Sequence, residues 1–590
     1  MGVKTNLLHT VSFAALAAAL LSACGPDNPQ NTGGSGGGTS TGGGGSTTTS
    51  TGPDLTEELY APDHVVEVNI EIAPADWDAL RTQSRTISEM LGENCQDGPH
   101  DSPYTYFPAN VTVDGQLLEN SGVRKKGFLG SASLSKPSLK VSFDEYEAGR
   151  EAFGVEGLTL NNSRQDPSFV KTCLAMKVFR DAGLPASRCN FARVTVNGTD
   201  MGVYVNIEPV NKRMLARHFA DNTGNLYEGQ LSDFRPGWSA TYEKKTNEDN
   251  PDRSDIDAVT DALTKPDGEL ESALGAVVDI DTFIKYWATE TLIAAWDGYT
   301  NNLNNHFVYT DPSTGKMAFL PWGPDMSFDA DDPFLPSSRP QSVSAKGRIS
   351  RRLYSIPSFQ SKYISAMNNL LNTVWKEDAL LAEIDRVEKL VEPYLPNGSN
   401  ASGPTDQVRS FVEGRRNVIT AELAPNPPAW PFPEASVACL STVGKVSGTF
   451  STTFGTLPQL QTQPFNTGDA TFDLEIPVGM PQSASATGAA SGYENGSNSR
   501  RRVIVIGAFA GGKTYALVFD VEPEMFAAGK DGKFDWQAVF AVGIDIVGPG
   551  QFETIGLFGD GVLHLDEAQN TSGAPVSGTF EGTLLSSFLN

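Results

Sequence analysis

Apolar and polar residues alternate along the first folded part of the chain, a pattern typical of half-buried strands. Residues 65–72, VVEVNIEI, alternate strictly, which predicts a strand with one face toward a core. NVTVDGQ at 110–116 and SGVRKKGF at 121–128 predict two more strands joined by an Asp-Gly turn. SLKVSF at 138–143 predicts another. The opening lobe is therefore expected to be rich in β-structure.

The next region changes to the longer period of helices. Asp166 followed by Pro167 is a good helix start, and apolar residues then recur at helical spacing as far as Gly183. Strands at 191–196 and 201–208 follow, joined by a hairpin turn at Asn197-Gly198. Helices are expected to dominate the rest of this domain, at 211–219, 281–296, 358–374, 376–390 and 405–423.

The composition changes at the segment APNPPAWPFPEAS, where prolines break any helix. Beyond it come short β-type runs such as RRVIVIGAF and YALVFDVE, separated by Gly, Ser and Thr turns. The sequence therefore predicts an α+β domain at 60–424, a proline-rich linker at 425–436 and an all-β, sandwich-like domain at 437–590. Nothing in the β domain indicates a chemistry.

The amino terminus has the features of an export signal. Lys4 precedes an apolar run that ends in Leu21-Ser22-Ala23-Cys24. This tetrad resembles a bacterial lipobox, which implies removal of residues 1–23 and a lipid on Cys24; an ordinary secretory peptide is the alternative. Residues 25–53 are rich in Gly, Ser and Thr and predict a flexible tether. The expected location is the cell envelope outside the cytoplasm, with Gly25 favouring the outer membrane.

The net charge of the chain bears on which class of molecule it can bind. The 590 residues include 71 acidic and 44 basic side chains, a net charge of -27, which repels a phosphate backbone and argues against nucleic acid.

Four cysteines remain after the lipobox, and an even set in an exported protein predicts two disulfides with three possible pairings. Cys173 with Cys189 is preferred because the helix and turn between them can fold back. Cys95 would then pair with Cys439.

The stretch AWDGYTNNLNNHFVY at 295–309 gathers one acid and four asparagines between a predicted helix and a strand. Asp297 is placed in the last helical turn, where the negative end of the helix dipole disfavours it by about 0.3–1 kcal/mol. A metal ion or a lysine would offset that cost, although Asp and Asn also form ordinary turns. Asparagine oxygens suit magnesium or calcium, and Asn302 lies at the interval seen in protein kinases.

Several separated motifs resemble, in order, those of the CotH (spore-coat protein H) kinase family over residues 65–424. They include GVRKKGFLGSASLSKPSLKVSFDEY, NLYEG, the Asp297 region, PWGPDMSFD and RSFVEGRRNVI. The resemblance implies an atypical protein-kinase-like, two-lobed domain. It also implies transfer of the ATP γ-phosphate, with Mg²⁺ or Mn²⁺, to Ser or Thr of exported or surface proteins.

The resemblance also assigns nucleotide-binding residues. Lys140 corresponds to the lysine expected to touch the nucleotide phosphates, and Lys136 and Arg124 are nearby in sequence. Glu208 corresponds to the family's glutamate, which would orient Lys140 as its charge partner. A solvated strand face is the alternative for the lysines.

The catalytic and metal-binding residues follow from the same resemblance. Asp297 falls on the acid proposed as catalytic, and Asn305 matches the family's asparagine ligand better than Asn302 does. Asp325 ends the following strand as a metal carboxylate, with an exposed acidic loop as the alternative. The family typically has Pro-Trp-Asp-x-Asp, whereas Gly323 replaces the first acid here. The acids at 329–332 are possible substitutes.

Three classes of function therefore compete. The first is a lipid-anchored kinase acting on exported proteins, and the second is a pseudokinase that serves as a surface binding or assembly protein. Gly323 favours the second. A calcium-binding structural protein is the third, resting on the acids at 329–332. A serine hydrolase has little support because there is no Gly-x-Ser-x-Gly elbow.

Overall fold

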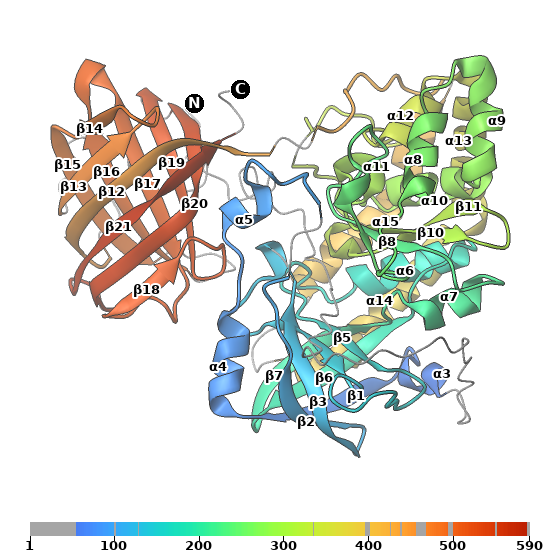
Figure 1. Cartoon of the computed structure of the whole chain (residues 1–590), viewed down its shortest axis with the longest axis horizontal. Coiled ribbons are helices and arrows are strands. Elements are labelled where there is room, and N and C mark those ends of the chain that lie inside the picture. The colour runs from blue at the N-terminus through green and yellow to red at the C-terminus, as the bar shows by residue number, and fades with distance from the viewer. Residues whose placement is uncertain are drawn as a thin grey trace, which may run out of the picture.

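Figure 1 shows the computed structural model of the chain. The predicted signal peptide, Cys24 and the tether lie outside the residues that it describes. Within the described part, no helix is both long enough and apolar enough to cross a membrane. The described residues are 55–98, 102–127, 129–333, 335–395, 402–424, 426–436, 439–455, 468–493, 500–548 and 551–586.

The first lobe is a closed barrel, which confirms the β-rich opening. Its strand order is β1-β2-β3-β4-β5-β7-β6, and parallel pairing of β1 with β6 closes it. Alternate side chains such as Val68, Val123 and Leu139 fill the interior. The strands are β1 (Val65–Ile72), β2 (Phe107–Val113), β3 (Gln116–Lys126), β4 (Ser138–Ser142), β5 (Gly157–Asn161), β6 (Cys189–Val196) and β7 (Thr199–Ile207), and three short helices accompany them, α3 (Thr56–Leu59), α4 (Pro74–Thr82) and α5 (Ile87–Leu91).

The second lobe is mainly helical and contains a small sheet of order β11-β10-β8-β9. Buried aromatic rings form its core; the ring centroids of Trp287 and Tyr363 are 4.0 Å apart. The sheet strands are β8 (Leu226–Gly229), β9 (Tyr242–Lys244), β10 (His306–Asp311) and β11 (Lys316–Pro321). The helices are α6 (Lys171–Asp181), α7 (Lys212–His218), α8 (Ser254–Ala262), α9 (Asp267–Val277), α10 (Ile280–Leu292), α11 (Tyr299–Asn302), α12 (Arg348–Tyr354), α13 (Pro357–Thr373), α14 (Glu377–Val391) and α15 (Ser402–Leu423).

Two predicted helix boundaries are wrong in ways that matter for the site. Helix α10 ends at Leu292, not at 296, because Ala294 adopts a left-handed backbone conformation with φ of 52°. Helix α6 begins at Lys171, and Asp166 caps it from a distance, since its carboxylate accepts from the Lys171 N–H at 2.8 Å. The helical spacing of apolar residues continues past both points, so periodicity does not detect either break.

The C-terminal domain is all-β, as predicted, and consists of one long antiparallel sheet that curls around an apolar core. Its strand order is β14-β13-β12-β21-β20-β19-β17-β16-β15, and β18 pairs with β20. The strands are β12 (Ser441–Thr453), β13 (Asp469–Glu475), β14 (Pro481–Ser483), β15 (Ala486–Tyr493), β16 (Arg501–Ala508), β17 (Thr514–Val521), β18 (Lys530–Lys533), β19 (Val539–Gly548), β20 (Gln551–Ala568) and β21 (Pro575–Ser586).

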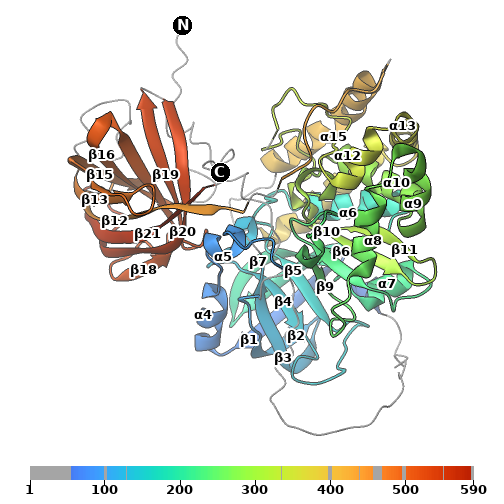
Figure 2. The ribbon, with the colours of Figure 1, turned by 45° about the horizontal axis from the view of Figure 1, so that its top comes forward.

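The β domain lies beside the barrel, with α5 between them (Figures 1 and 2). Both disulfides of the preferred pairing are present: Cys173–Cys189 joins α6 to β6, and Cys95–Cys439 joins the segment after α5 to the start of the β domain. The proline-rich segment packs on the helical lobe, because Trp430 is buried in that core. The three parts of the chain are therefore tied together rather than strung on free linkers.

Candidate functional site

The candidate catalytic residue Asp297 lies between two helices. It follows the end of α10 and precedes Gly298, the N-cap of the short helix α11. The prediction that Asp297 occupies the last turn of a helix is therefore wrong, since that helix has already ended. The unfavourable dipole inferred from the sequence does not act on this carboxylate.

A buried glutamate fixes this loop. Glu290 in α10 accepts hydrogen bonds from the backbone N–H groups of Tyr299 at 3.1 Å and Thr300 at 3.0 Å, and from the Tyr286 hydroxyl at 2.6 Å. These are the first residues of α11, whose N–H groups have no partner within the helix. Burial raises the pKa of Glu290 to about 6. Its carboxylate thus stabilises the start of α11 directly behind Asp297.

Three asparagine side chains surround the Asp297 carboxylate, and we call them the amide cage. Asn302 and Asn304 donate to Oδ1 at 2.7 and 3.2 Å, and Asn305 donates to Oδ2 at 2.7 Å. Asp297 is only 5% exposed, so these donors compensate for the lost hydration of its charge. Within the described residues, three neutral amides thus stabilise the buried charge of Asp297.

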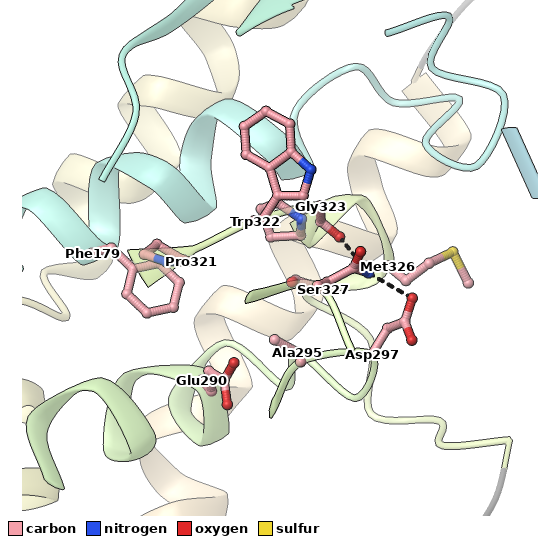
Figure 3. A pocket seen from close by; sticks show the side chains of 12 residues that line it. Phe179, Glu290, Ala295, Asp297, Pro321, Trp322, Gly323, Met326 and Ser327 are labelled. Carbon is pink, nitrogen blue, oxygen red and sulfur yellow. Dashed lines mark hydrogen bonds between the residues drawn. The ribbon is translucent and has the colours of Figure 1, made fainter. Parts of the chain in front are cut away.

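Asn305 links the amide cage to the segment after β11. Its Nδ2 also reaches the Gly323 carbonyl oxygen at 3.3 Å, while its Oδ1 is buried and has no hydrogen-bond partner among the described residues. Figure 3 shows Asp297 and Gly323 in the wall of a small cavity, which holds about 10 Å³. A buried, unsatisfied amide oxygen is a fitting ligand for a hard cation such as Mg²⁺.

Gly323 stands in close contact with Asn305. Its backbone is left-handed, with φ of 48°, and a Cβ atom built on it would lie 2.6 Å from Asn305 Oδ1. A longer side chain at this position would therefore need Asn305 to move. The acid that the family resemblance leads one to expect at position 323 is thus replaced by a glycine against which the Asn305 amide packs.

Asp325 lies two residues further on, in the 3₁₀ turn Pro324–Met326. Burial raises its pKa to about 6, and the nearby Asp166 charge adds to this, while the charges of Lys126 and Lys171 act in the opposite direction. Strong burial of an acid beside a second acid is typical of functional sites. The exposed acidic loop considered from the sequence does not describe Asp325, which is 4% exposed.

Lys126 is the cation that sequence reasoning missed. Its Nζ lies 5.9 Å from the centre of the Trp322 ring, which lines the same cavity as Asp297. The cross-strand pair Arg124 and Lys140 shares one face of the barrel with Lys126, because side chains two residues apart on a strand point the same way. We call this outer face the cation face, and Lys126 is its contact with Trp322 of the helical lobe. The sequence did contain a signal for this: in the run RKK at 124–126, the first and third residues of a strand point to the same face.

The predicted phosphate-binding residues have the following neighbours. Burial raises the pKa values of Glu145 and Glu248, and the nearby Lys140 charge opposes this shift in both. The buried Arg124 guanidinium lies 5.2 Å from the centre of the Tyr106 ring. Lys136 donates to the Val203 carbonyl oxygen at 2.7 Å.

Lys136 is therefore engaged by β7, and burial lowers its pKa to about 8. Of these cations, Arg124 and Lys140 belong to the cation face, whereas Lys136 binds the barrel wall.

Glu208 does not have the partner predicted for it. Its carboxylate accepts from the Arg188 guanidinium at 2.7 Å, from the Arg188 N–H at 3.0 Å and from the Arg217 guanidinium. Lys140 pairs across the sheet with Thr159, and Thr159 pairs with Ile207, the residue before Glu208, so these three side chains share one face. Because neighbouring residues of a strand point to opposite faces, Glu208 is directed away from the cation face.

The acids at 329–332 do not compensate for Gly323. Asp329 and Asp331 are exposed, and Asp332 accepts from the Asn301 amide at 2.7 Å and lies 3.4 Å from the Arg339 guanidinium. Among the described residues, no group of three or more His, Cys, Asp or Glu side chains is arranged to hold a metal ion. The calcium hypothesis gains no support from these contacts.

The contact between Gly323 and Asn305 leads to a stability prediction. Gly323→Ala is expected to lower the free energy of unfolding by about 1–3 kcal/mol, from backbone strain and displacement of the Asn305 amide. Gly315→Ala is the matched control, because Gly315 also has a positive φ, 69°, but nothing lies near the added Cβ atom. Thermal unfolding of both variants measures the difference, and equal losses of Tm would mean that Asn305 does not resist the new methyl group.

Comparison with known families gives a consistent result for the central part of the chain. The profile of a family described as CotH kinase protein matches residues 123–419, about half of the chain. The matched region contains the cation face, the amide cage and Asp325. It begins at β3, so the first two barrel strands precede it.

Individual relatives are similar over part of the chain. Inner spore coat protein H of Bacillus subtilis is 23% identical over 313 residues, which is 49% of this chain and 84% of that protein. Invasin CotH2 of Rhizopus delemar is 26% identical over 254 residues, covering 40% of this chain and 42% of that protein.

Among solved structures, the Helicobacter pylori proinflammatory kinase CtkA aligns with a TM-score of 0.26 and 10% identity. The alignment covers 50% of this chain and 91% of that one. A similarity this weak carries no argument about the present chain.

Proposed function

Because the chain belongs to the CotH kinase family, we propose that it transfers the γ-phosphate of ATP to Ser or Thr side chains of exported or surface proteins. The observation that carries this proposal is the Asp297 carboxylate, buried and held in a fixed orientation by the amide cage, at a cavity that also contains Trp322 and Gly323. Phosphoryl transfer requires mainly positioning and electrostatic stabilisation. A rigidly held carboxylate in a cavity whose Trp322 wall lies near Lys126 would meet both needs.

Asp297 would accept the proton of the attacking hydroxyl. Both of its oxygens already accept amide hydrogen bonds, at 2.7 Å from Asn302 and 2.7 Å from Asn305, so its orientation is fixed before a substrate arrives. Carboxylates retain further lone pairs for a hydroxyl donor. Preorganisation of this kind lowers the barrier because no reorientation is needed during the reaction.

The phosphates would lie between the cation face and Asp325. Lys126, Arg124 and Lys140 would supply positive charge from the barrel, as phosphate oxygens require. Asp325 and Asn305 would hold Mg²⁺ or Mn²⁺, which supplies neutralisation of charge between the β- and γ-phosphates when bound. The unsatisfied Asn305 Oδ1 supports its assignment as a ligand, and Asn302, which bonds Asp297, is better assigned to the amide cage.

One specific observation favours the alternative, a pseudokinase that binds or assembles surface proteins. An acid at position 323 would have to displace the Asn305 amide, because the left-handed backbone of Gly323 packs against it. A metal site with one carboxylate and one amide binds Mg²⁺ more weakly than one with two carboxylates. Slow transfer that responds more strongly to Mn²⁺ than to Mg²⁺ would lie between the two possibilities.

Location completes the proposal. A lipid on Cys24 would anchor the protein to a membrane of the cell envelope, on the side away from the cytoplasm, with the tether at 25–53 between lipid and barrel. The two disulfides support an oxidising compartment, because such bonds persist there. The substrates would accordingly be proteins that are themselves exported.

Transfer of radiolabel tests the proposal. The full chain is incubated with [γ-³²P]ATP, Mg²⁺ or Mn²⁺ and an envelope protein fraction. Labelled phosphoserine or phosphothreonine is expected after partial acid hydrolysis. Nucleotide binding without any transfer, under either metal, would favour the pseudokinase. A chain that neither binds nucleotide nor transfers label would contradict the proposed kinase function.

A further inference from the structure

The β domain contacts β3 on the side of the strand opposite the cation face. Lys125 in β3 is fully buried, and its ammonium donates to the carbonyl oxygens of Arg81 at 2.7 Å and Gln83 at 2.9 Å and to Oε1 of Gln537. These three acceptors use all three of its N–H groups. Gln537 belongs to the β domain, and its Nε2 donates longer hydrogen bonds to the carbonyl oxygens of Thr82 and Gln83.

Lys125 is the residue between Arg124 and Lys126. Since neighbouring side chains of a strand point to opposite faces, the β domain holds one side of β3 while the other side carries the cation face. The candidate phosphate-binding cations therefore sit on a strand whose position depends on a contact with a separate domain.

A second, electrostatic interaction connects the β domain with a loop near Asp325. Arg164 lies in the loop that also carries Asp166, the neighbour of Asp325, and donates to the Ala132 carbonyl oxygen in the loop between β3 and β4. Burial lowers the pKa of Arg164 to about 10, and the charges of Arg500 and Glu522 in the β domain also act on it. The β domain thus lies near β3 and near the loop that carries Arg164 and Asp166.

The docking is extensive and covalently fastened. The apolar side of α5, with Ile87, Met90 and Leu91, packs on the outer face of the β sheet. Hydrogen bonds flank this helix, from Ser84 to Asp535 at 2.6 Å and from Thr86 to Asp560 at 2.8 Å. The disulfide Cys95–Cys439 closes the same junction. Such a set fixes one orientation of the two domains, as a free linker would not.

We propose that the C-terminal β domain is a positioning domain for the candidate phosphate site, and that Gln537 acts as a positioning residue through Lys125 and β3. This role rests on the proposed function for its effect on nucleotide, but its structural part stands on the contacts alone. Loss of the Gln537 acceptor leaves the buried ammonium with an unused donor, which β3 can satisfy only by shifting toward water.

The experiment compares Gln537→Ala with the matched control Gln482→Ala, an exposed glutamine of the same domain, in the full chain. Hydrogen–deuterium exchange is followed at 116–127 and 129–136, and the dissociation constant of a fluorescent ATP analogue is measured with Mn²⁺. Gln537→Ala is expected to speed exchange at both segments and to weaken nucleotide binding, each ~10-fold. Gln537→Glu, which keeps an acceptor for Lys125, is expected to restore slow exchange.

The two readouts separate the failure of this inference from failure of the proposed function. Unchanged exchange at β3 in Gln537→Ala would overturn the positioning role, whatever the activity. Faster exchange with unaltered nucleotide affinity would overturn the coupling to the site. If the wild-type chain binds no nucleotide, the proposed function fails, and the exchange data alone then decide whether the β domain fixes β3.

Discussion

Asp297→Ala is expected to lower the rate of phosphoryl transfer about 10³-fold while the affinity for nucleotide stays within about threefold of the wild type. The reason is that the proposed function assigns Asp297 to the incoming hydroxyl and not to the phosphates or the cation. Its removal would leave the amides of Asn302 and Asn305 without their shared acceptor. Initial rates of label transfer and binding of an ATP analogue measure the two quantities.

A second variant separates chemistry from folding. Asp297→Asn keeps the size of the side chain and one oxygen acceptor for the amide cage, so the fold should survive while the proton acceptor is lost. Asp331→Asn is the matched control, because Asp331 is an exposed acid of the same region. Full activity in Asp297→Asn would show that this carboxylate is not the proton acceptor, and an equal loss in Asp331→Asn would point to a general effect of charge.

The sequence was sufficient for the family and the fold class, because these depend on patterns that repeat over many residues. Alternation in 65–72 and 138–143 predicted strands, although not that they close into a barrel, and the β domain was recognisable from its short strands and turns. The preferred disulfide pairing is also present. The short strands β5, β8 and β9 and the helices α8, α9 and α12 were not predicted, since short elements carry few periods.

The site itself was only partly predictable. The asparagine-rich stretch after α10 identified the right loop, but not that its amides bond the neighbouring acid, since that requires the left-handed turn at Ala294 and the separate helix α11. Glu208 was assigned to Lys140 by order along the chain, whereas strand alternation turns it toward Arg188. Residue types can be predicted from sequence; which face each one occupies depends on register, and register emerges from pairing in three dimensions.

Asp325→Asn is expected to make the protein more stable at about pH 7 and to abolish nucleotide binding that depends on the metal. Burial raises the pKa of Asp325 from 3.8 to about 6 in the folded state, so folding at neutral pH has to bury a charge at a cost on the order of 1–3 kcal/mol. Asparagine has nearly the same shape and carries no charge. The variant removes that cost and, with it, the carboxylate assigned to the cation.

The sign of the pH dependence makes this prediction specific. A carboxyl whose pKa is higher in the folded state binds its proton more tightly there, so its contribution to stability is favourable at low pH and is lost as the pH rises from about 4 to about 6. The stabilisation of Asp325→Asn over the wild type should therefore be small near pH 4 and reach its full value above about pH 6. Thermal unfolding across this range measures it, with Asp331→Asn as the exposed control. A Tm below that of the wild type for Asp325→Asn at neutral pH would contradict this prediction. It would mean that the Asp325 carboxylate stabilises the fold through its own hydrogen bonds or ion pairs.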